Sequence, residues 1–182
     1  MTLSGYQVIL TEVCEDDIEF IRQWRNDPGV SQYMLSQQII SAEQQRAWFN
    51  KIQRDDSQQH FVIHYKEQAI GVANIRACYP GESLKTARAI EPGLYIATEK
   101  YRNNILAFAP TLVLNDYCFD DLPCTELIAV VKADNLAALN YNQKLGYRIE
   151  KHKEKTEALV EIRLNKADYQ QHTVQLKALL CR

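Results

Sequence analysis

One stretch of the sequence decides the fold: VVKADNLAALNYNQKLGY, residues 130–147. It starts at the end of a continuous apolar run, residues 125–131, which is typical of a central strand covered on both faces. Asn135 then stands at a helix-cap position, apolar residues follow, and Gly146 ends the helix. The stretch therefore predicts a strand, a short helix and a second strand in close succession.

Working outward, the rest of the chain alternates between strand and helix patterns. Strands are predicted at residues 6–10, 60–65, 69–77, 87–97, 125–131, 147–152 and 159–164, and helices after Asp16-Asp17, from the Ser41 capping box, at residues 104–119, after Asn135 and at residues 165–180. This order predicts an α/β (α+β) domain with a mixed sheet. Pro110 predicts a kink or a late helix start. Pro92-Gly93 indicates a bulge, or a place where something approaches the backbone.

Length and composition narrow the possible functions. The 182 residues predict a single domain, residues 1–182, and the apolar fraction of 46% is enough for a real core. A net charge of -2 and a pI near 6.1 argue against a nucleic-acid-binding surface. Since no apolar run reaches the roughly 20 residues of a membrane span, and residues 1–5 lack the pattern of a signal peptide, we expect a cytoplasmic protein without a membrane partner.

The cysteines and histidines do not predict a metal site. The five cysteines form no CxxC pair, which favours free thiols in a reducing compartment over disulfides or zinc ligands. His60 and His64 share one face of a predicted strand, and a packed or solvent-facing pair is the simpler interpretation.

Residues 91–107 suit a ligand that carries both amides and phosphates. A strand edge at Leu94 to Ile96 can bond amides, and the turn at residues 98–103 leads into a buried helix that opens at Asn104. The free N–H groups of a helix start favour phosphate. An ordinary strand-to-helix loop is the alternative.

The residue order of the opening stretch resembles the segment that closes the acetyl-CoA site of GCN5-related N-acetyltransferases. That family carries Asn-x-x-Ala-x-x-x-Tyr-x-Lys-x-Gly-Phe/Tyr, and the matching residues here are Asn135, Ala138, Lys144, Gly146 and Tyr147. Asn142 stands where the family has a tyrosine that often serves as general acid. Tyr141 lies one residue earlier, about 100° around the helix, so it is no simple substitute.

The turn before the buried helix resembles the family's Arg/Gln-x-x-Gly-x-Gly/Ala pattern. Arg102 and Ala107 match it, whereas Ile105 replaces a glycine and is expected to crowd a phosphate. The resemblance implies a mostly antiparallel sheet flanked by helices, with splayed strands that form the cofactor cleft. It implies acetyl-CoA as the cofactor, held by Leu94, Ile96, Arg102, Asn103, Asn104, Ile105, Leu106, Ala107, Asn135 and Asn142.

The N-terminal third resembles one branch of the family, which includes ribosomal-protein alanine and pseudaminic-acid-pathway amino-sugar N-acetyltransferases. Trp24-Arg25-Asn26 followed by Met34 is most similar to the sugar-amine group. These residues are the candidate acceptor contacts. Arg76 joins them, because Arg25 and Arg76 suit an anionic acceptor such as a nucleotide diphosphate. The helical spacing of Trp24 to Ile21 favours a core position for Trp24, whereas Arg25 and Asn26 fit a solvated helix end equally well.

The implied chemistry is direct transfer of an acetyl group to a primary amine, which must first lose a proton. Glu91 is the candidate base, with a surface carboxylate as the alternative. Tyr95 and Tyr141 are candidate acids or substrate contacts. Asn142 is better suited to bond the cofactor than to donate a proton, because an amide does not titrate usefully.

Three functions remain open at this point. The first is an N-acetyltransferase for a small amine, expected to be an amino sugar carried on a nucleotide. The second acetylates protein N-termini and favours an open, acidic groove. The third is an acyl-CoA-binding regulatory module that has lost the chemistry, to which Ile105 and Asn142 point. We expect a monomer or a homodimer.

Overall fold

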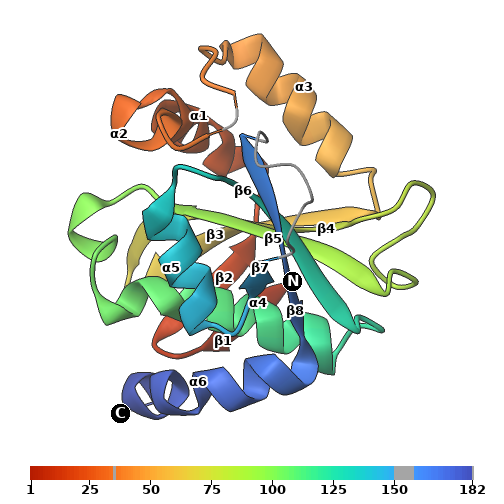
Figure 1. Ribbon diagram of the computed structural model, residues 1–182. Coiled ribbons are helices and arrows are strands. Elements are labelled where there is room, and N and C mark those ends of the chain that lie inside the picture. Colours follow the sequence, from red (N-terminus) through yellow and green to blue (C-terminus); the bar gives the residue numbers. More distant parts are fainter. Residues whose placement is uncertain (35, 150–157, 182) are drawn as a thin grey trace.

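A computed structural model describes residues 1–34, 36–149 and 158–181, and these contain an eight-stranded sheet (Figure 1). The strands lie in the order β1-β2-β3-β4-β5-β6-β8-β7, and every neighbouring pair is antiparallel except β5 and β6. The predicted mixed, mostly antiparallel sheet is confirmed. The bounds are β1 Thr2–Gly5, β2 Val8–Glu12, β3 Gln58–Tyr65, β4 Gln68–Ala77, β5 Ala89–Ile96, β6 Glu126–Lys132, β7 Arg148–Ile149 and β8 Leu159–Asn165.

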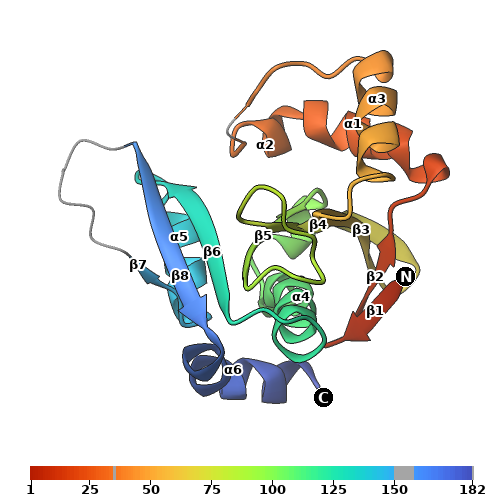
Figure 2. The same cartoon turned by 90° about the vertical axis from the view of Figure 1, so that its right-hand side faces the viewer.

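Helices cover both faces of the sheet (Figures 1 and 2). The helices α1, α2 and α3 lie over one face, α4 lies against the other, and α6 runs beneath the end where β8 finishes. The α-helical bounds are α1 Ile18–Asn26, α2 Pro28–Ser31, α3 Ala42–Ile52, α4 Ala109–Asp120, α5 Leu136–Lys144 and α6 Lys166–Leu180; 3₁₀ turns occur at Glu15–Asp17, Glu99–Tyr101 and Ile105–Phe108.

Side-chain caps fix most helix starts, as the sequence predicts. Ser41 and Gln44 form the expected capping box of α3. Asn135 caps α5 by accepting a hydrogen bond from the Ala138 N–H at 3.0 Å. Gly146 ends the same helix with a φ of +99°, and a Cβ there would lie 2.9 Å from the Asp168 carbonyl oxygen. Only glycine suits that position.

The helix predicted at residues 104–119 starts late. Asn104 caps a 3₁₀ turn at Ile105–Phe108, and α4 follows from Ala109 with Pro110 in its first turn. A proline in the first turn loses no helical hydrogen bond. Of the two outcomes expected from Pro110, the late start is the observed one.

The N-terminal strand prediction is wrong at its start. Tyr6 and Gln7 have φ values of 52° and 72° and form the turn between β1 and β2, so the second strand begins at Val8. The sequence analysis missed β1. At the other end, β7 covers Arg148–Ile149, and the rest of the predicted strand at residues 150–152 lies outside the described residues.

Two apolar clusters hold the fold. The main core lies between the sheet and α4, and its fully buried members include Leu10, Phe61, Ile75, Leu112 and Leu127. The second cluster lies under α1 and α3 and is smaller; it contains Val13, Ile21, Val62 and Val72, with Phe20, Trp24, Trp48, Phe49, Ala69 and Tyr95 packed against them.

Candidate active site

The strands β5 and β6 pair over only two residues and then part. Ala89 pairs with Glu126 and Ile90 with Leu127, after which neither strand has a partner on this side (Figure 2). On its other edge β5 pairs with β4 from Ile90 to Ile96 without a register shift. The bulge suggested by Pro92-Gly93 is therefore absent from the β4 side. The irregularity lies on the β6 side instead, where the β5 backbone is left open.

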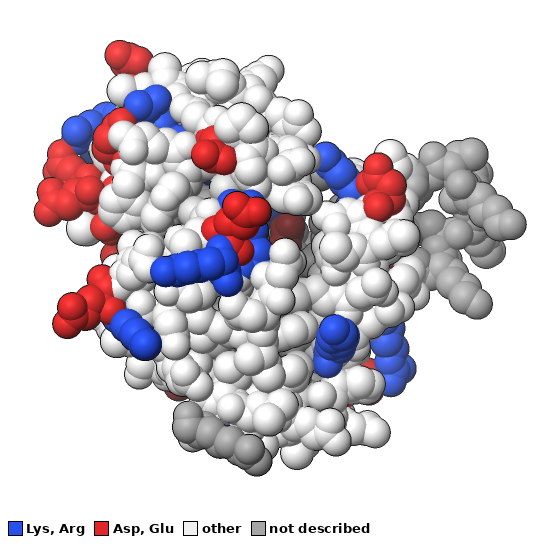
Figure 3. Space-filling model, turned by 90° about the vertical axis from the view of Figure 1, so that its left-hand side faces the viewer, with Lys and Arg blue, Asp and Glu red and all other residues white. Residues whose placement is uncertain are grey.

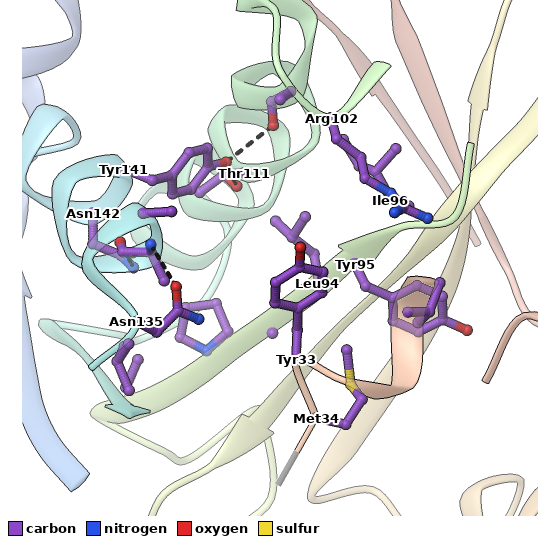
Figure 4. Close-up of a pocket in the computed structure, with 18 of the residues that line it drawn as sticks. Tyr33, Met34, Leu94, Tyr95, Ile96, Arg102, Thr111, Asn135, Tyr141 and Asn142 are labelled. Carbon is purple, nitrogen blue, oxygen red and sulfur yellow. Dashed lines mark hydrogen bonds between the residues drawn. The ribbon is translucent and has the colours of Figure 1, made fainter. Parts of the chain in front are cut away.

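A cavity of about 520 Å³ fills the space between the parted strands (Figure 4). Space-filling atoms show a hollow near the centre of this face, with acidic and basic side chains around it (Figure 3). Many predicted site residues line the cavity: Met34, Leu94, Tyr95, Ile96, Arg102, Asn103, Ala107, Asn135, Tyr141 and Asn142. The predicted residues Trp24, Arg25, Asn26, Arg76, Glu91, Asn104, Ile105 and Leu106 do not line it.

The turn before α4 presents unused N–H groups beside the cavity. The backbone N–H groups of Asn103, Asn104 and Ile105 donate no hydrogen bond within the described part of the chain. Asn104 is itself used as a cap, because its side chain accepts from the Leu106 N–H at 2.9 Å and donates to the Lys100 carbonyl at 2.9 Å. Such a turn suits an anionic group.

Ile105 does not crowd this turn. Its side chain is 42% exposed and lies outside the cavity lining, and its φ is not in the left-handed region that favours glycine. A Cβ at this position therefore costs no backbone strain. The replacement of the family glycine leaves the cavity open.

Arg102 holds the end of β5 in place. Its guanidinium donates to the carbonyl oxygens of Ile96, Ala97 and Gly29 at 2.8, 2.6 and 2.9 Å. The last bond ties α2 to the turn. These bonds use three of the five N–H groups of the guanidinium, so two remain for a cofactor.

Tyr141 crosses from α5 to the start of α4. Its hydroxyl donates to the Ala107 carbonyl at 3.0 Å and lies 2.5 Å from the Thr111 hydroxyl, and its ring stacks on Phe108 with centroids 4.5 Å apart. Burial raises the pKa of Tyr141 above its ordinary value. Asn142, one residue later, donates to the Ala138 carbonyl at 2.9 Å. Tyr141 therefore braces the cavity wall, and its proton is already bonded.

Two polar groups are buried without a partner beneath α1. They are the Tyr95 hydroxyl and the Arg25 Nη1 atom, and neither has a hydrogen bond within the described residues. Burial raises the pKa of Tyr95, and the nearby charge of Arg25 opposes that rise. Tyr95 lines the cavity, whereas Arg25 is half-buried and lies outside the cavity lining. A guanidinium without a partner next to the cavity wall is suited to an anion.

Comparison with known proteins places the whole arrangement in one family. A model of the acetyltransferase (GNAT) domain matches residues 7–148. The chain belongs to the GNAT family. Its parted strands, unused turn N–H groups and braced α5 lie where the sequence resemblance predicts the cofactor cleft, and the position of the cofactor stays a prediction.

This GNAT chain is similar to several acetyltransferases. The acetyltransferase PseH of Campylobacter jejuni is 30% identical over 142 residues, covering 76% of this chain and 82% of that protein. The spermidine N(1)-acetyltransferase of Escherichia coli is 23% identical and covers 81% and 76%. Among solved structures, apo FdhC, described as a nucleotide-linked sugar GNAT, has a TM-score of 0.79 at 17% identity and covers 100% of this chain and 99% of that one.

The GNAT chain is thus an acetyl-CoA-dependent N-acetyltransferase. A related GNAT structure, PseH in complex with acetyl coenzyme A, has a TM-score of 0.63, is 22% identical and covers 87% of this chain and 99% of that one. In the described part of the GNAT chain, no helix has the length and apolarity to cross a membrane. The described residues also contain no group of three acidic, His or Cys side chains placed to hold a metal ion.

The candidate base and several of the candidate acceptor contacts interact with other residues of the protein. Glu91 forms an ion pair with Arg76, its neighbour across β4 and β5. Asn26 bonds the Ile40 backbone twice, at 2.9 Å and 2.8 Å, and so positions the segment before α3. Trp24 packs in the second cluster, with its ring 4.8 Å from Phe20, which agrees with its helical spacing to Ile21.

The structure adds lining residues of the GNAT cleft that the sequence analysis missed. These are chiefly Tyr33, Glu99, Thr111 and Tyr147. Thr111 carried a readable signal, because it is the one polar residue in the otherwise apolar run of residues 105–114. Tyr33 gave none, since its role depends on how α2 folds over β5.

Proposed function

We propose that the acceptor is the primary amine of a sugar that is carried on a nucleotide. The observation that carries the proposal is the buried Arg25 Nη1, which has no partner and lies near the Tyr95 hydroxyl. Arg25 is half-buried and forms no ion pair within the described residues, so its charge is available to an anion, and the phosphates of a nucleotide supply one. The relatives PseH and FdhC support the same class of acceptor.

The same charge argues against a polyamine acceptor. A polyamine carries several positive charges, and a buried guanidinium without a carboxylate partner repels them. The likeness to spermidine acetyltransferases at 23% identity therefore supports the family more than the substrate. Among the residues that the structure describes, no contact favours a protein N-terminus as acceptor.

The reaction is a single displacement on the thioester carbon. The neutral amine forms a C–N bond, the carbonyl oxygen becomes an oxyanion bonded by N–H groups of the open β5 edge, and the C–S bond then breaks. The ammonium must first lose one proton to a base. Glu91 is the candidate, and because it pairs with Arg76 and lies outside the cavity lining, it would act through water. The nitrogen gives up its second proton after the attack, and the departing thiolate takes it up. The CoA thiolate leaves readily because a thiol pKa near 8.5 requires little acid assistance. This is consistent with Asn142 in place of a tyrosine.

Two measurements on the whole chain test this function in order. Saturating acetyl-CoA is expected to raise the unfolding temperature, since it binds only the folded state. Release of CoA thiol is then measured with a panel of amines: nucleotide-linked amino sugars, free amino sugars, spermidine and an alanine-ended peptide. The proposal expects the highest kcat/KM with a nucleotide-linked amino sugar, and a preference for spermidine or the peptide would overturn it.

A matched pair of variants tests the anion site. Arg25→Met removes the positive charge and keeps a long, unbranched side chain. It is expected to raise the acceptor KM about tenfold or more. Arg76→Met removes an exposed charge that already pairs with Glu91 and should change the acceptor KM much less. Equal effects of the two variants would contradict a role for Arg25 in binding the acceptor.

Several expectations about the whole molecule accompany the proposal. We propose that residues 1–182 act as one domain, in the cytoplasm, as a monomer or a homodimer. Size-exclusion chromatography with light scattering checks the oligomeric state.

A further inference from the structure

Three rows of side chains cross β3, β4 and β5 on the face beneath α1 and α3. Residues directly opposite one another in antiparallel strands share a face, and successive rows on that face lie about 7 Å apart. The register defines the rows Val62–Val72–Tyr95, His60–Asn74–Gly93 and Gln58–Arg76–Glu91. The first row belongs to the second apolar cluster. In the middle row the His60 ring contacts Trp48 of α3, with centroids 5.2 Å apart, which confirms the face.

The middle row ends on the open part of β5. Ile90 is the last residue of β5 that pairs with β6, and Gly93 comes three residues later. Gly93 lines the cavity. A Cβ on Gly93 would lie 2.8 Å from Asn74 Oδ1 and 3.6 Å from Nδ2. The Asn74 amide therefore occupies the space above the β5 backbone that a side chain at position 93 would otherwise fill.

The Asn74 amide has no partner of its own. It is half-buried, and it makes no hydrogen bond within the part of the chain that the structure describes. The neighbouring polar residues of the same face are engaged: His60 with Gln58 at 2.8 Å, and Arg76 with Glu91. A half-buried amide left unused among satisfied neighbours is available to a ligand.

We propose that Asn74 orients the acceptor amine, by accepting one of its N–H groups on Oδ1, for attack on the thioester held at the open β5 edge. The inference rests on the proposed amine acceptor. An attacking amine must aim its lone pair at the carbonyl carbon, and a fixed acceptor for one N–H sets that direction. Asn74 itself does not line the cavity, so its amide faces the cleft only across Gly93, where the missing side chain leaves the way open.

A substitution series separates this role from simple packing. Asn74→Leu keeps the size of the side chain and removes its oxygen, so kcat is expected to fall about 10- to 100-fold, while the KM for acetyl-CoA and its thermal shift stay unchanged. Asn74→Asp keeps an acceptor oxygen in the same place and retains most of kcat. Asn50→Leu, the same change on the exposed side of α3, is the control and keeps wild-type kinetics.

The pair with Gly93 gives an independent test. Gly93→Ala puts a Cβ against Asn74 Oδ1, so it should displace the amide and lower kcat to a similar extent. In an Asn74→Ala background the oxygen is gone, so adding Gly93→Ala should cost little more. Effects that multiply across the two sites would mean independent roles and would contradict the proposal.

All assays use the whole chain, acetyl-CoA and the best acceptor of the amine panel. If the wild-type chain transfers acetyl to no amine, the proposed function fails. If the wild type transfers and Asn74→Leu keeps its kcat, or Asn74→Asp loses as much as Asn74→Leu, the proposed function survives and the role of Asn74 is overturned.

Discussion

Alternate residues of β4 face two different environments. On the α4 side, Ala73 and Ile75 lie fully buried in the main core. On the side of α1 and α3, Val72 lies in the second cluster, but Asn74 and Arg76 continue the strand as polar residues. The same strand thus stabilises the fold with one face and leaves part of its other face for a ligand.

Buried polar atoms show the same difference. Side-chain atoms without a hydrogen-bond partner occur on the α4 side at Asn115, and on the other side at Arg25, Gln45 and Tyr95 of α1, α3 and β5. Since an unpaired buried polar group costs about 1–3 kcal/mol, the second side is the less stable one. The acceptor site that we propose therefore lies on the side of the sheet that is less well packed.

The largest expected effect tests the stabilising side. Leu112 of α4 is 0% exposed, and Leu112→Ala should lower the free energy of unfolding by about 2–5 kcal/mol through the cavity it leaves. Val72→Ala on the opposite side should cost about 1–2 kcal/mol. Urea unfolding measures both, and equal losses would break the comparison between the two faces.

The second effect concerns pH. Burial lowers the pKa of His60 from 6.5 to about 4, with the charge of Asp55 opposing the shift. The unfolded chain therefore binds a proton between these pH values while the folded chain does not. The contribution of His60 to the free energy of unfolding is therefore complete above pH 6.5. It falls by up to about 3 kcal/mol as the pH drops towards 4. His60→Gln should flatten unfolding curves measured across this window, and an unchanged slope would contradict a neutral, packed His60.

A smaller effect of opposite sign is expected at Tyr95. Tyr95→Phe removes a buried hydroxyl without a partner, so the free energy of unfolding should rise by about 1 kcal/mol. The same variant should raise the acceptor KM if the hydroxyl meets the ligand. Calorimetry and steady-state kinetics together sharpen the comparison, because stability and binding then change in opposite directions. A loss of both would mean that Tyr95 only supports the fold.

The smallest effect is expected on the cofactor side of the cleft. Asn142→Tyr restores the tyrosine that the family usually carries. Because a thiolate leaves with little help from an acid, kcat should rise by less than about tenfold. The pH dependence of kcat checks this, and a larger gain would show that protonation of the thiolate limits the present enzyme.

Local signals predicted much of the fold. The capping box at Ser41, the cap at Asn135 and the stop at Gly146 are properties of a few neighbouring residues, so the sequence alone locates them. Strand pairing is different, because it depends on residues far apart in the chain. Pro92-Gly93 marked the right place, but no local pattern shows that the irregularity faces β6 and not β4.

The candidate site was predicted where it follows a motif and missed where it depends on packing. The cavity-lining Asn135 and Ala107 come from recognisable segments. The engagement of Arg102 with three carbonyls, and of Tyr141 with Ala107, follows from side chains that meet only in the folded chain. Sequence type alone had allowed both residues a chemical role.

Because β5 and β6 pair over only two residues, the sheet consists of two parts, one of β1 to β5 and one of β6, β8 and β7. At the end where β5 and β6 are paired, α6 is bonded to α4: the Tyr169 hydroxyl donates to Asp116 at 2.7 Å, and the Lys166 ammonium donates to the Phe119 carbonyl at 2.9 Å. These bonds help to hold the two parts of the sheet together. Where β5 and β6 have parted, Tyr141 of α5 connects the two parts through its hydrogen bond to the Ala107 carbonyl. A cofactor bound between the parted strands would take the place of the hydrogen bonds that β5 and β6 do not make with each other. In the position proposed for it between β5 and β6, acetyl-CoA is expected to hold the two parts of the sheet together, so the chain should be least rigid after the cofactor has left.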